Sequence, residues 1–339
     1  IRVLVVEDSM VFRNLLVQGL NQDRALEVVA TASDPFEARD QIIEYRPDVM
    51  TLDIELPRMS GLEFLRKLMP QYPLPVVIIS ALSEKVFDAM KAGAVDFVAK
   101  PQVTEREQLR NFLCSELPVK IKVASTAHVS RYKKPVVFAA DQHLSVRSDI
   151  DIIAIGASTG GTEAIAEVIR DFSTDIPGTV IVQHMPPGFT EMYANRLDSQ
   201  SRVKVKEAKN GDMVAPGQVL IAPGGSEHMS IVKVGDNYKV VLKKGEKVNG
   251  HCPSVDVLFN SVADVAGAHA IGIILTGMGG DGAKGLLKMQ KNGARTIGQD
   301  EASCIVYGMP KVAYDLGAVM YQEKLSDIAK KIYTLLNQR

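Results

Sequence analysis

The stretch IIAIGASTGG, residues 152–161, decides the fold class of the second half of the chain. Residues 152–155 are apolar and mostly β-branched, as in a buried strand, and residues 156–161 are small. Apolar residues at helical spacing follow over 163–172. A strand that passes through a tight turn into a helix is the repeating unit of a parallel α/β sheet.

The same alternation continues to the C-terminal side. Further strands and helices are expected at 179–183, 219–222, 255–266, 270–275 and 282–291. The less helical stretch 203–243 predicts several short strands, including a hairpin that turns at Gly235 and Asp236. An amphipathic helix follows near the end of the chain, with Leu325, Ile328, Ile332 and Leu335 on its apolar face. We therefore expect a doubly wound α/β domain with a mostly parallel sheet.

The first part of the chain has its own series of apolar strands separated by amphipathic helices. The strands are expected at 2–6, 27–31, 49–53, 76–80 and 95–99. This pattern predicts a flavodoxin-like five-stranded parallel sheet. Its last helix is expected over 105–117 and to end at Pro118.

The predicted organisation is a first domain over 1–118, a linker over 119–149 and a larger second domain over 150–339. The linker is rich in Lys and Arg, and its composition fits either a solvated connector or a docking segment.

The composition excludes several classes of protein. Apolar residues make up 46% and charged residues 23% of the 339 residues, and the net charge is −1, so disorder and a general attraction for nucleic acid are excluded. No apolar run is long enough for a membrane helix, so we expect no membrane insertion. Three separated cysteines, Cys114, Cys252 and Cys304, fit reduced thiols in a cytoplasmic protein and exclude a cysteine zinc site.

Acidic residues follow two strands of the first domain. Glu7 and Asp8 follow the first strand, and Asp53 ends the third. Ser80 and Lys100 stand at the ends of the fourth and fifth strands. The carboxyl ends of parallel strands meet at one edge of the sheet, where carboxylates can bind Mg²⁺ and a carboxylate can accept a phosphoryl group.

The second domain carries a candidate nucleophile. Ser158 lies within GASTG, which matches G-x-S-x-G after a strand and before a helix. The same turn could instead be a helix cap or a phosphate-binding turn. His184 ends the next strand and is the best candidate for a general base, and Asp281 follows the strand 270–275. The order Ser158, His184, Asp281 differs from that of ordinary α/β-hydrolases.

Two other histidines and one loop leave alternatives open. His228 and His251 lie in loops and are candidate substrate contacts, whereas His269 precedes a strand and is expected at the wrong edge. The loop GMGGDG, residues 277–282, also matches G-x-G-x-x-G, with Asp300 about twenty residues on, as in a dinucleotide site. An acidic side chain inside that loop disfavours a pyrophosphate.

Four segments of the first domain resemble a response-regulator receiver: VVEDS at 5–9, TLDIELPRMSGLEFLRKL at 51–68, IISA at 78–81 and GAVDFVAKP at 93–101. The resemblance implies that Asp53 accepts the phosphoryl group and that Glu7, Asp8 and Asp53 surround Mg²⁺. It also implies that Ser80 is the switch hydroxyl and that Lys100 contacts the phosphoryl group.

Five segments of the second domain resemble the catalytic domain of the chemotaxis protein-glutamate methylesterase (CheB) family: IGASTGGTEA at 155–164, QHMPPGFT at 183–190, IAPGGSEHM at 221–229, HCPSVDVLF at 251–259 and LTGMGGDGAKGL at 275–286. The resemblance implies a triad of Ser158, His184 and Asp281. It also implies that Met278 gives an oxyanion-hole N–H and that Thr159 and His251 line the site.

The family resemblance implies a phosphorylation-activated esterase that acts on methylated glutamates of chemoreceptors and deamidates their glutamines. It implies a CheA-type histidine kinase as phosphodonor, Mg²⁺ at the receiver and no cofactor at the esterase. The main rival is a non-catalytic phospho-switch that binds receptors or kinase. A DNA-binding output is disfavoured because the second domain has no basic recognition helix.

Overall fold

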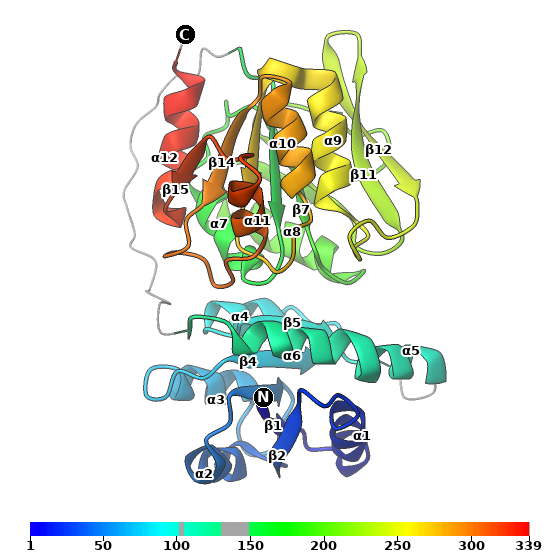
Figure 1. Ribbon diagram of the computed structural model, residues 1–339, viewed down its shortest axis with the longest axis vertical. Coiled ribbons are helices and arrows are strands. Elements are labelled where there is room, and N and C mark those ends of the chain that lie inside the picture. The colour runs from blue at the N-terminus through cyan, green and yellow to red at the C-terminus, as the bar shows by residue number, and fades with distance from the viewer. Residues whose placement is uncertain (102–104, 130–148, 339) are drawn as a thin grey trace. The chain divides into compact units, whose positions relative to one another are not determined.

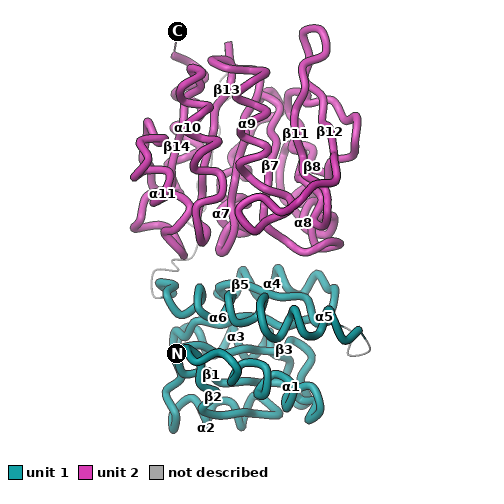
Figure 2. Tube along the Cα trace, turned by 45° about the vertical axis from the view of Figure 1, so that its right-hand side comes forward, with its two compact units in different colours: residues 1–132 teal, residues 133–339 magenta. Residues whose placement is uncertain are grey.

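The chain divides into two compact units, residues 1–132 and 133–339, shown in different colours in Figure 2. The structure is a computed structural model, and it describes residues 1–101, 105–129 and 149–338. Each unit is built around a parallel sheet, so the predicted fold class is confirmed. Most of the predicted linker, residues 130–148, lies outside the described residues. Within them, no helix has the length and apolar character needed to cross a membrane.

Unit 1 has a five-stranded sheet in the order β2-β1-β3-β4-β5, and all of its pairs are parallel. The strands are β1 (Arg2–Val6), β2 (Glu27–Ala32), β3 (Val49–Asp53), β4 (Val76–Ser80) and β5 (Asp96–Ala99). The central strands β3 and β4 are buried along their whole length. A strand that is covered on both faces is mostly apolar, which explains the sequence VVIIS of β4 and the residues Val49, Met50 and Leu52 of β3.

Helices cover both faces of this sheet (Figure 1). They are α1 (Met10–Leu20), α2 (Pro35–Tyr45), α3 (Gly61–Leu68), α4 (Lys85–Lys91), α5 (Arg106–Asn111), the π-helix η1 (Phe112–Glu116) and α6 (Leu117–Ser125). Three of them begin at a side-chain cap, because Ser9, Asp34 and Ser60 accept hydrogen bonds from N–H groups of the first turn.

The prediction that the last helix of this unit ends at Pro118 is wrong. The chain stays helical through η1 and α6 as far as Ser125. Proline lacks an N–H, but it is tolerated in the first turn of a helical segment, and Pro118 lies in the first turn of α6, directly after the wider turns of η1. Lys120, which was assigned to a basic linker, instead pairs with Asp96 at 2.7 Å.

Unit 2 has a seven-stranded sheet in the order β15-β14-β13-β6-β7-β10-β8, again with only parallel pairs. The strands are β6 (Ile152–Ala157), β7 (Gly178–Gln183), β8 (Lys204–Glu207), β10 (Gln218–Ile221), β13 (Ala270–Ile274), β14 (Arg295–Gln299) and β15 (Tyr321–Glu323). The three strands β13, β6 and β7 are neighbours at its centre.

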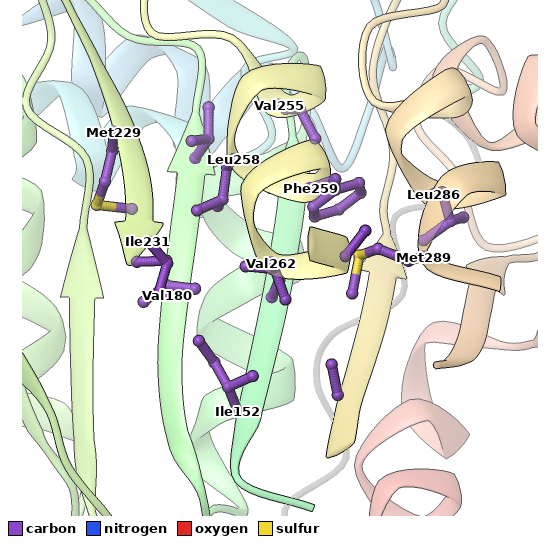
Figure 3. Close-up of a cluster of buried hydrophobic side chains, with 14 of the residues drawn as sticks. Ile152, Val180, Met229, Ile231, Val255, Leu258, Phe259, Val262, Leu286 and Met289 are labelled. Atoms are coloured by element: carbon purple, nitrogen blue, oxygen red, sulfur yellow. The ribbon is translucent and has the colours of Figure 1, made fainter. Parts of the chain in front are cut away.

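The helices of unit 2 lie on both faces of the sheet. They are α7 (Gly161–Arg170), α8 (Phe189–Gln200), α9 (Val255–Ala266), the short 3-10 helix η3 (Gly267–His269), α10 (Ala283–Lys291), α11 (Met309–Asp315) and α12 (Leu325–Leu336). Helices α9, α10 and α11 pack side by side on one face, and α7 packs with α12 (Figure 1). The core under α9 and α10 joins Phe259 and Leu286 to the sheet residues Ile152 and Val180 (Figure 3).

A small antiparallel sheet completes unit 2. It is formed by β9 (Met213–Val214), β11 (Glu227–Val234) and β12 (Asn237–Lys244), in the order β11-β12-β9. The predicted hairpin is confirmed, since Val234 pairs with Asn237 and leaves Gly235 and Asp236 as the turn. Gly235 has φ +60°, which a two-residue turn that starts with glycine requires.

The packing of α9 on the sheet predicts a large cost for Phe259→Ala. The Phe259 side chain is fully buried in the core, so its removal should lower the free energy of unfolding of unit 2 by about 3–5 kcal/mol. Urea unfolding of the full chain, followed by hydrogen exchange on peptides from unit 2, measures this loss. The control Val234→Ala changes a residue on β11 that is 52% exposed, and it should stay within about 0.5 kcal/mol of wild type. Equal effects of the two changes would contradict this description of the core.

Candidate active site and phosphorylation site

The three candidate catalytic residues of unit 2 follow three adjacent parallel strands. Ser158 comes directly after β6, His184 directly after β7, and Asp281 lies in the loop after β13. Parallel strands end at the same edge, so this strand order places the three residues at one edge of the sheet. His269, in contrast, precedes β13 and hydrogen-bonds the carbonyl of Asp149, as expected for the opposite edge.

His184 and Asp281 form a buried pair. The distance between His184 Nε2 and Asp281 Oδ2 is 2.8 Å, and the two side chains are 7% and 1% exposed. The other ring nitrogen, Nδ1, is buried and has no hydrogen-bond partner among the described residues. The imidazole is therefore held through Nε2, and Nδ1 is left for a proton exchange at this edge of the sheet.

The Asp281 carboxylate accepts hydrogen bonds from five groups. The donors are His184 Nε2, Asn249 Nδ2, Ser254 Oγ and the backbone N–H groups of Val255 and Asp256. Burial acts to raise the pKa of Asp281, but the hydrogen bonds from His184 and Asn249 prevail and hold it well below its usual value. Asp281 is therefore ionised at neutral pH and can stabilise a cation at His184.

The backbone of Ser158 is held on both sides. Its N–H donates to the Thr276 carbonyl at 3.0 Å, and its carbonyl accepts from the Gly161 N–H at 2.7 Å. The turn needs glycine at 160, where φ is +76°, and at 161, where a Cβ would lie 2.6 Å from Ala157 Cβ. These contacts fix the backbone around the Ser158 hydroxyl.

Gln183, which was not among the predicted site residues, links the ends of β6 and β7. Its amide nitrogen donates to the Ser158 carbonyl at 2.9 Å and to the His184 carbonyl at 3.1 Å. The side chain is 3% exposed. A polar residue at the end of the apolar strand TVIVQ was the one signal that pointed to it. Gln183 thus ties the backbone of the candidate nucleophile to that of the candidate base.

The glycine-rich loop after β13 runs against Ser158. A Cβ at Gly277 would lie 2.7 Å from Ser158 Cβ, so only glycine permits this approach. The next residue, Met278, is 48% exposed, and Thr159 is buried. The loop is less suited to a dinucleotide, since Asp281 inside it is used by His184, and the Asp300 carboxylate accepts from the Ser303 N–H at 3.0 Å.

His228 and His251 have different surroundings, and the prediction that His228 lies in a loop is wrong, because it lies on β11 and pairs with Lys243 of β12. His228 is buried, accepts the Ser254 N–H at Nδ1 and contacts the Glu246 carbonyl through Nε2. Both of its nitrogens are used inside the protein, so its interpretation as a substrate contact is wrong. The His251 ring lies parallel to the His184 ring, with centroids 3.7 Å apart and 6° between the planes.

In unit 1, the predicted acidic cluster is formed. Oxygen atoms of Glu7, Asp8 and Asp53 all lie within 4.8 Å of one another, which suits a hard cation with oxygen ligands. Lys100 Nζ contacts Glu7 Oε2 and Asp53 Oδ2, each at 2.8 Å. Ser80 is buried at the end of β4 and accepts the Lys100 N–H at its carbonyl.

The charges in this cluster compensate one another only in part. Burial raises the pKa of Glu7 to about 7, and hydrogen bonds from Lys100 oppose that rise. Burial acts to lower the pKa of Lys100, but hydrogen bonds to Asp53 and Glu7 prevail and raise it. The cluster holds more negative than positive groups, as expected for a site that takes a cation.

Comparison with known proteins assigns both units. Residues 153–332 match the family described as CheB methylesterase. The chain belongs to the CheB methylesterase family. Residues 3–113 match the family described as response regulator receiver domain, so unit 1 is a receiver domain.

Related CheB proteins match over the whole chain. A protein-glutamate methylesterase/protein-glutamine glutaminase 2 of Syntrophomonas wolfei is 61% identical and is aligned over 100% of this chain and 98% of its own length. A protein-glutamate methylesterase/protein-glutamine glutaminase of Syntrophotalea carbinolica is 52% identical with the same coverage. The crystal structure of the Thermotoga maritima CheB methylesterase catalytic domain covers 55% of this chain and 98% of its own, with 38% identity and a TM-score of 0.54.

The buried, ionised Asp281 predicts a pH-dependent effect of Asp281→Asn. Because its pKa is depressed in the folded chain, Asp281 adds stability above the pKa of an unfolded aspartate, about 3.9, and this contribution is lost as the pH falls toward the folded-state pKa. The variant should therefore be less stable than wild type at pH 7, and the deficit should shrink at pH 3. Urea unfolding of both chains at the two pH values measures it. An equal deficit at both would contradict an ionised Asp281.

Proposed function

We propose that this chain is a phosphorylation-regulated serine hydrolase that removes the methyl group from glutamate γ-methyl esters of chemoreceptors and deamidates receptor glutamines. The proposal rests chiefly on the buried His184–Asp281 pair, whose remaining nitrogen, Nδ1, has no hydrogen-bond partner among the described residues. Ser158 stands at the end of the adjacent strand. The family and its relatives support the choice of substrate.

In the proposed reaction, Ser158 Oγ attacks the γ-carbonyl carbon of the methylated glutamate, and His184 Nδ1 takes the proton of the Ser158 hydroxyl. Asp281 stabilises the resulting imidazolium through Nε2. The bond to the methoxy oxygen then breaks, and methanol leaves with the proton from Nδ1. Water attacks the acyl-enzyme, gives a proton to His184 and releases the glutamate, while Ser158 regains its proton. With glutamine the first leaving group is ammonia.

We assign stabilisation of the oxyanion to the Met278 N–H, with the N-terminal end of α7 beside it. The loop that carries Met278 is brought against Ser158 by Gly277, and α7 begins two residues after Thr159. Each donor at an oxyanion typically contributes about 3 kcal/mol to the stability of the transition state. Thr159 and His251 line the same site, which needs no cofactor in this scheme.

We further propose that phosphorylation of Asp53 by a CheA-type histidine kinase controls the hydrolase in the cytoplasm. Glu7, Asp8 and Asp53 would hold Mg²⁺, whose charge would offset that of the incoming phosphoryl group. Lys100 already contacts Asp53 and is in place to contact the phosphoryl group, and the Ser80 hydroxyl would follow it. Asp53 Oδ1 accepts the Glu55 N–H at 3.0 Å, which orients the carboxylate.

Ser158→Ala should abolish the release of methanol from methyl-labelled receptor membranes. Loss of the nucleophile should lower the rate by at least about a thousandfold. The matched control is Ser199→Ala on α8, because among the described residues the exposed Ser199 hydroxyl bonds only to the nearby Arg196 carbonyl. Release at the wild-type rate from the Ser158 variant, or no release from the wild type with Asp53 phosphorylated, would favour the non-catalytic phospho-switch or a different ester.

Asp53→Ala should remove the response to a phosphodonor. Wild-type chain should release methanol faster after a small phosphodonor and Mg²⁺ are added, whereas the rate of the variant should not change, because the acceptor carboxylate is gone. Asp40→Ala is the control, since the exposed Asp40 pairs only with the neighbouring Arg39 in the described structure. An equal rise in the Asp53 variant would contradict control through this residue.

A further inference from the structure

A four-residue turn, Val248 to His251, lies between β12 and α9. The two end residues exchange backbone hydrogen bonds, from the Val248 N–H at 3.0 Å and from the His251 N–H at 2.9 Å. The two central residues, Asn249 and Gly250, have φ of +52° and +84°. Positive φ at both central positions is the requirement of a type I′ turn, for which Asn-Gly is the favoured sequence.

The first central residue reaches the carboxylate of the catalytic pair. Asn249 Nδ2 donates to Asp281 Oδ1 at 2.8 Å and to Asp256 Oδ2 at 2.7 Å. Both hydrogens of the amide are therefore used, each on a buried carboxylate. Asn249 holds Oδ1 together with the Ser254 hydroxyl and the Asp256 N–H, so the Asp281 carboxylate cannot rotate without breaking these bonds, and Oδ2 stays directed at His184.

The last residue of the turn reaches the imidazole of the same pair. The His251 ring lies flat on the His184 ring, with a centroid separation of 3.7 Å. The bond to Asp281 fixes one edge of the His184 ring but leaves it able to tilt about that bond. A parallel ring at van der Waals distance opposes that tilt and thus keeps Nδ1 in the plane in which it has to exchange a proton.

We propose that the turn 248–251 is a clamp that positions both members of the catalytic pair, with Asn249 and His251 as positioning residues. The inference rests on the proposed function. In this inference His251 positions the His184 ring, whereas the family resemblance implies only that His251 lines the site. Asn249 and Gly250 are exposed, but the Asn249 amide bonds two buried carboxylates and Gly250 has positive φ, so substitutions here can also lower stability. A large loss of reactivity in a variant that keeps its fold therefore points to positioning.

The test compares variants of the turn by two readouts with phosphodonor and Mg²⁺ present. The first is the rate at which a fluorophosphonate inactivates Ser158, which reports the reactivity of the serine without any receptor. The second is the split between kcat and KM for methanol release. Thermal unfolding of each full-length variant identifies any chain that has lost its fold.

Asn249→Gly removes the amide and keeps a residue that tolerates positive φ, and it should slow inactivation about tenfold or more. His251→Ala should slow it about three- to tenfold, and His251→Phe, which retains a flat ring, should restore most of the rate. Both losses should fall on kcat and leave KM unchanged, because neither residue is assigned to substrate binding by the clamp.

Gly250→Ala tests the turn itself. A Cβ at Gly250 meets nothing within 4 Å, so its effect comes only from the backbone conformation, and the variant should be slower than wild type. The matched control is Gly235→Ala at the hairpin tip, where φ is +60° and a Cβ also meets nothing within 4 Å. This control should react at the wild-type rate.

The outcomes separate the inference from the proposed function. The variants could show the expected inactivation rates while the wild-type chain releases no methanol. That result would support the clamp and contradict the proposed substrate, the receptor glutamate methyl ester. Wild-type inactivation rates in folded Asn249→Gly and His251→Ala would overturn the clamp. So would a His251→Phe variant as slow as His251→Ala, or a wild-type chain that is inert to the fluorophosphonate.

Discussion

The structure of unit 2 around its active site depends on one buried negative charge, the carboxylate of Asp281. A buried carboxylate is costly unless every lone pair is met by a donor, and the chain supplies five donors from three separate segments. One is the end of β7, one is the turn 248–251, and one is the first turn of α9. Satisfying Asp281 therefore brings together parts of the chain that the sheet alone would leave unconnected.

The first turn of α9 contributes most to this arrangement. Ser254 is its N-cap residue, and the N–H groups of Val255 and Asp256 are among those that a helix leaves without partners at its start. Here both N–H groups donate to the Asp281 carboxylate, so the free donors of the helix and the buried charge become each other's hydrogen-bond partners. The close packing of Val255 against Gly156 and Gly282, where a Cβ would lie 2.2 and 2.5 Å from Val255 Cγ1, allows the helix to begin this near the strand ends.

The order of strands and the residues at their ends could be predicted from the sequence. Apolar runs located β6, β7 and β13, and the residues that follow them are Ser158, His184 and Asp281. Strands β14 and β15 were missed because RTIGQ is short and partly polar and YQE has three residues with no apolar run. The helix beyond Pro118 was missed because the π-helix that precedes it has no periodic signal. The roles of Gln183 and Asn249 could not be predicted, because both side chains bond segments that are distant in sequence. Tertiary packing brings those segments together, and the spacing of apolar residues in the sequence does not reveal it.

Each unit has a buried aspartate at the carboxyl ends of the strands of its own parallel sheet, Asp53 in unit 1 and Asp281 in unit 2. The two carboxylates differ in the groups that donate hydrogen bonds to them. Asp281 is met by donors that are mostly backbone or short side chains, all fixed by the fold, so it is ionised and closed to reagents. Asp53 is met by the Glu55 N–H and by Lys100, a long side chain that is itself 25% exposed, and it lies beside the exposed carboxylate of Asp8. A lysine has a flexible stem and can move aside for the proposed cation and phosphoryl group, whereas backbone donors are fixed by the fold. The difference in donors thus agrees with the two proposed roles, in which Asp281 orients a base and Asp53 accepts a phosphoryl group.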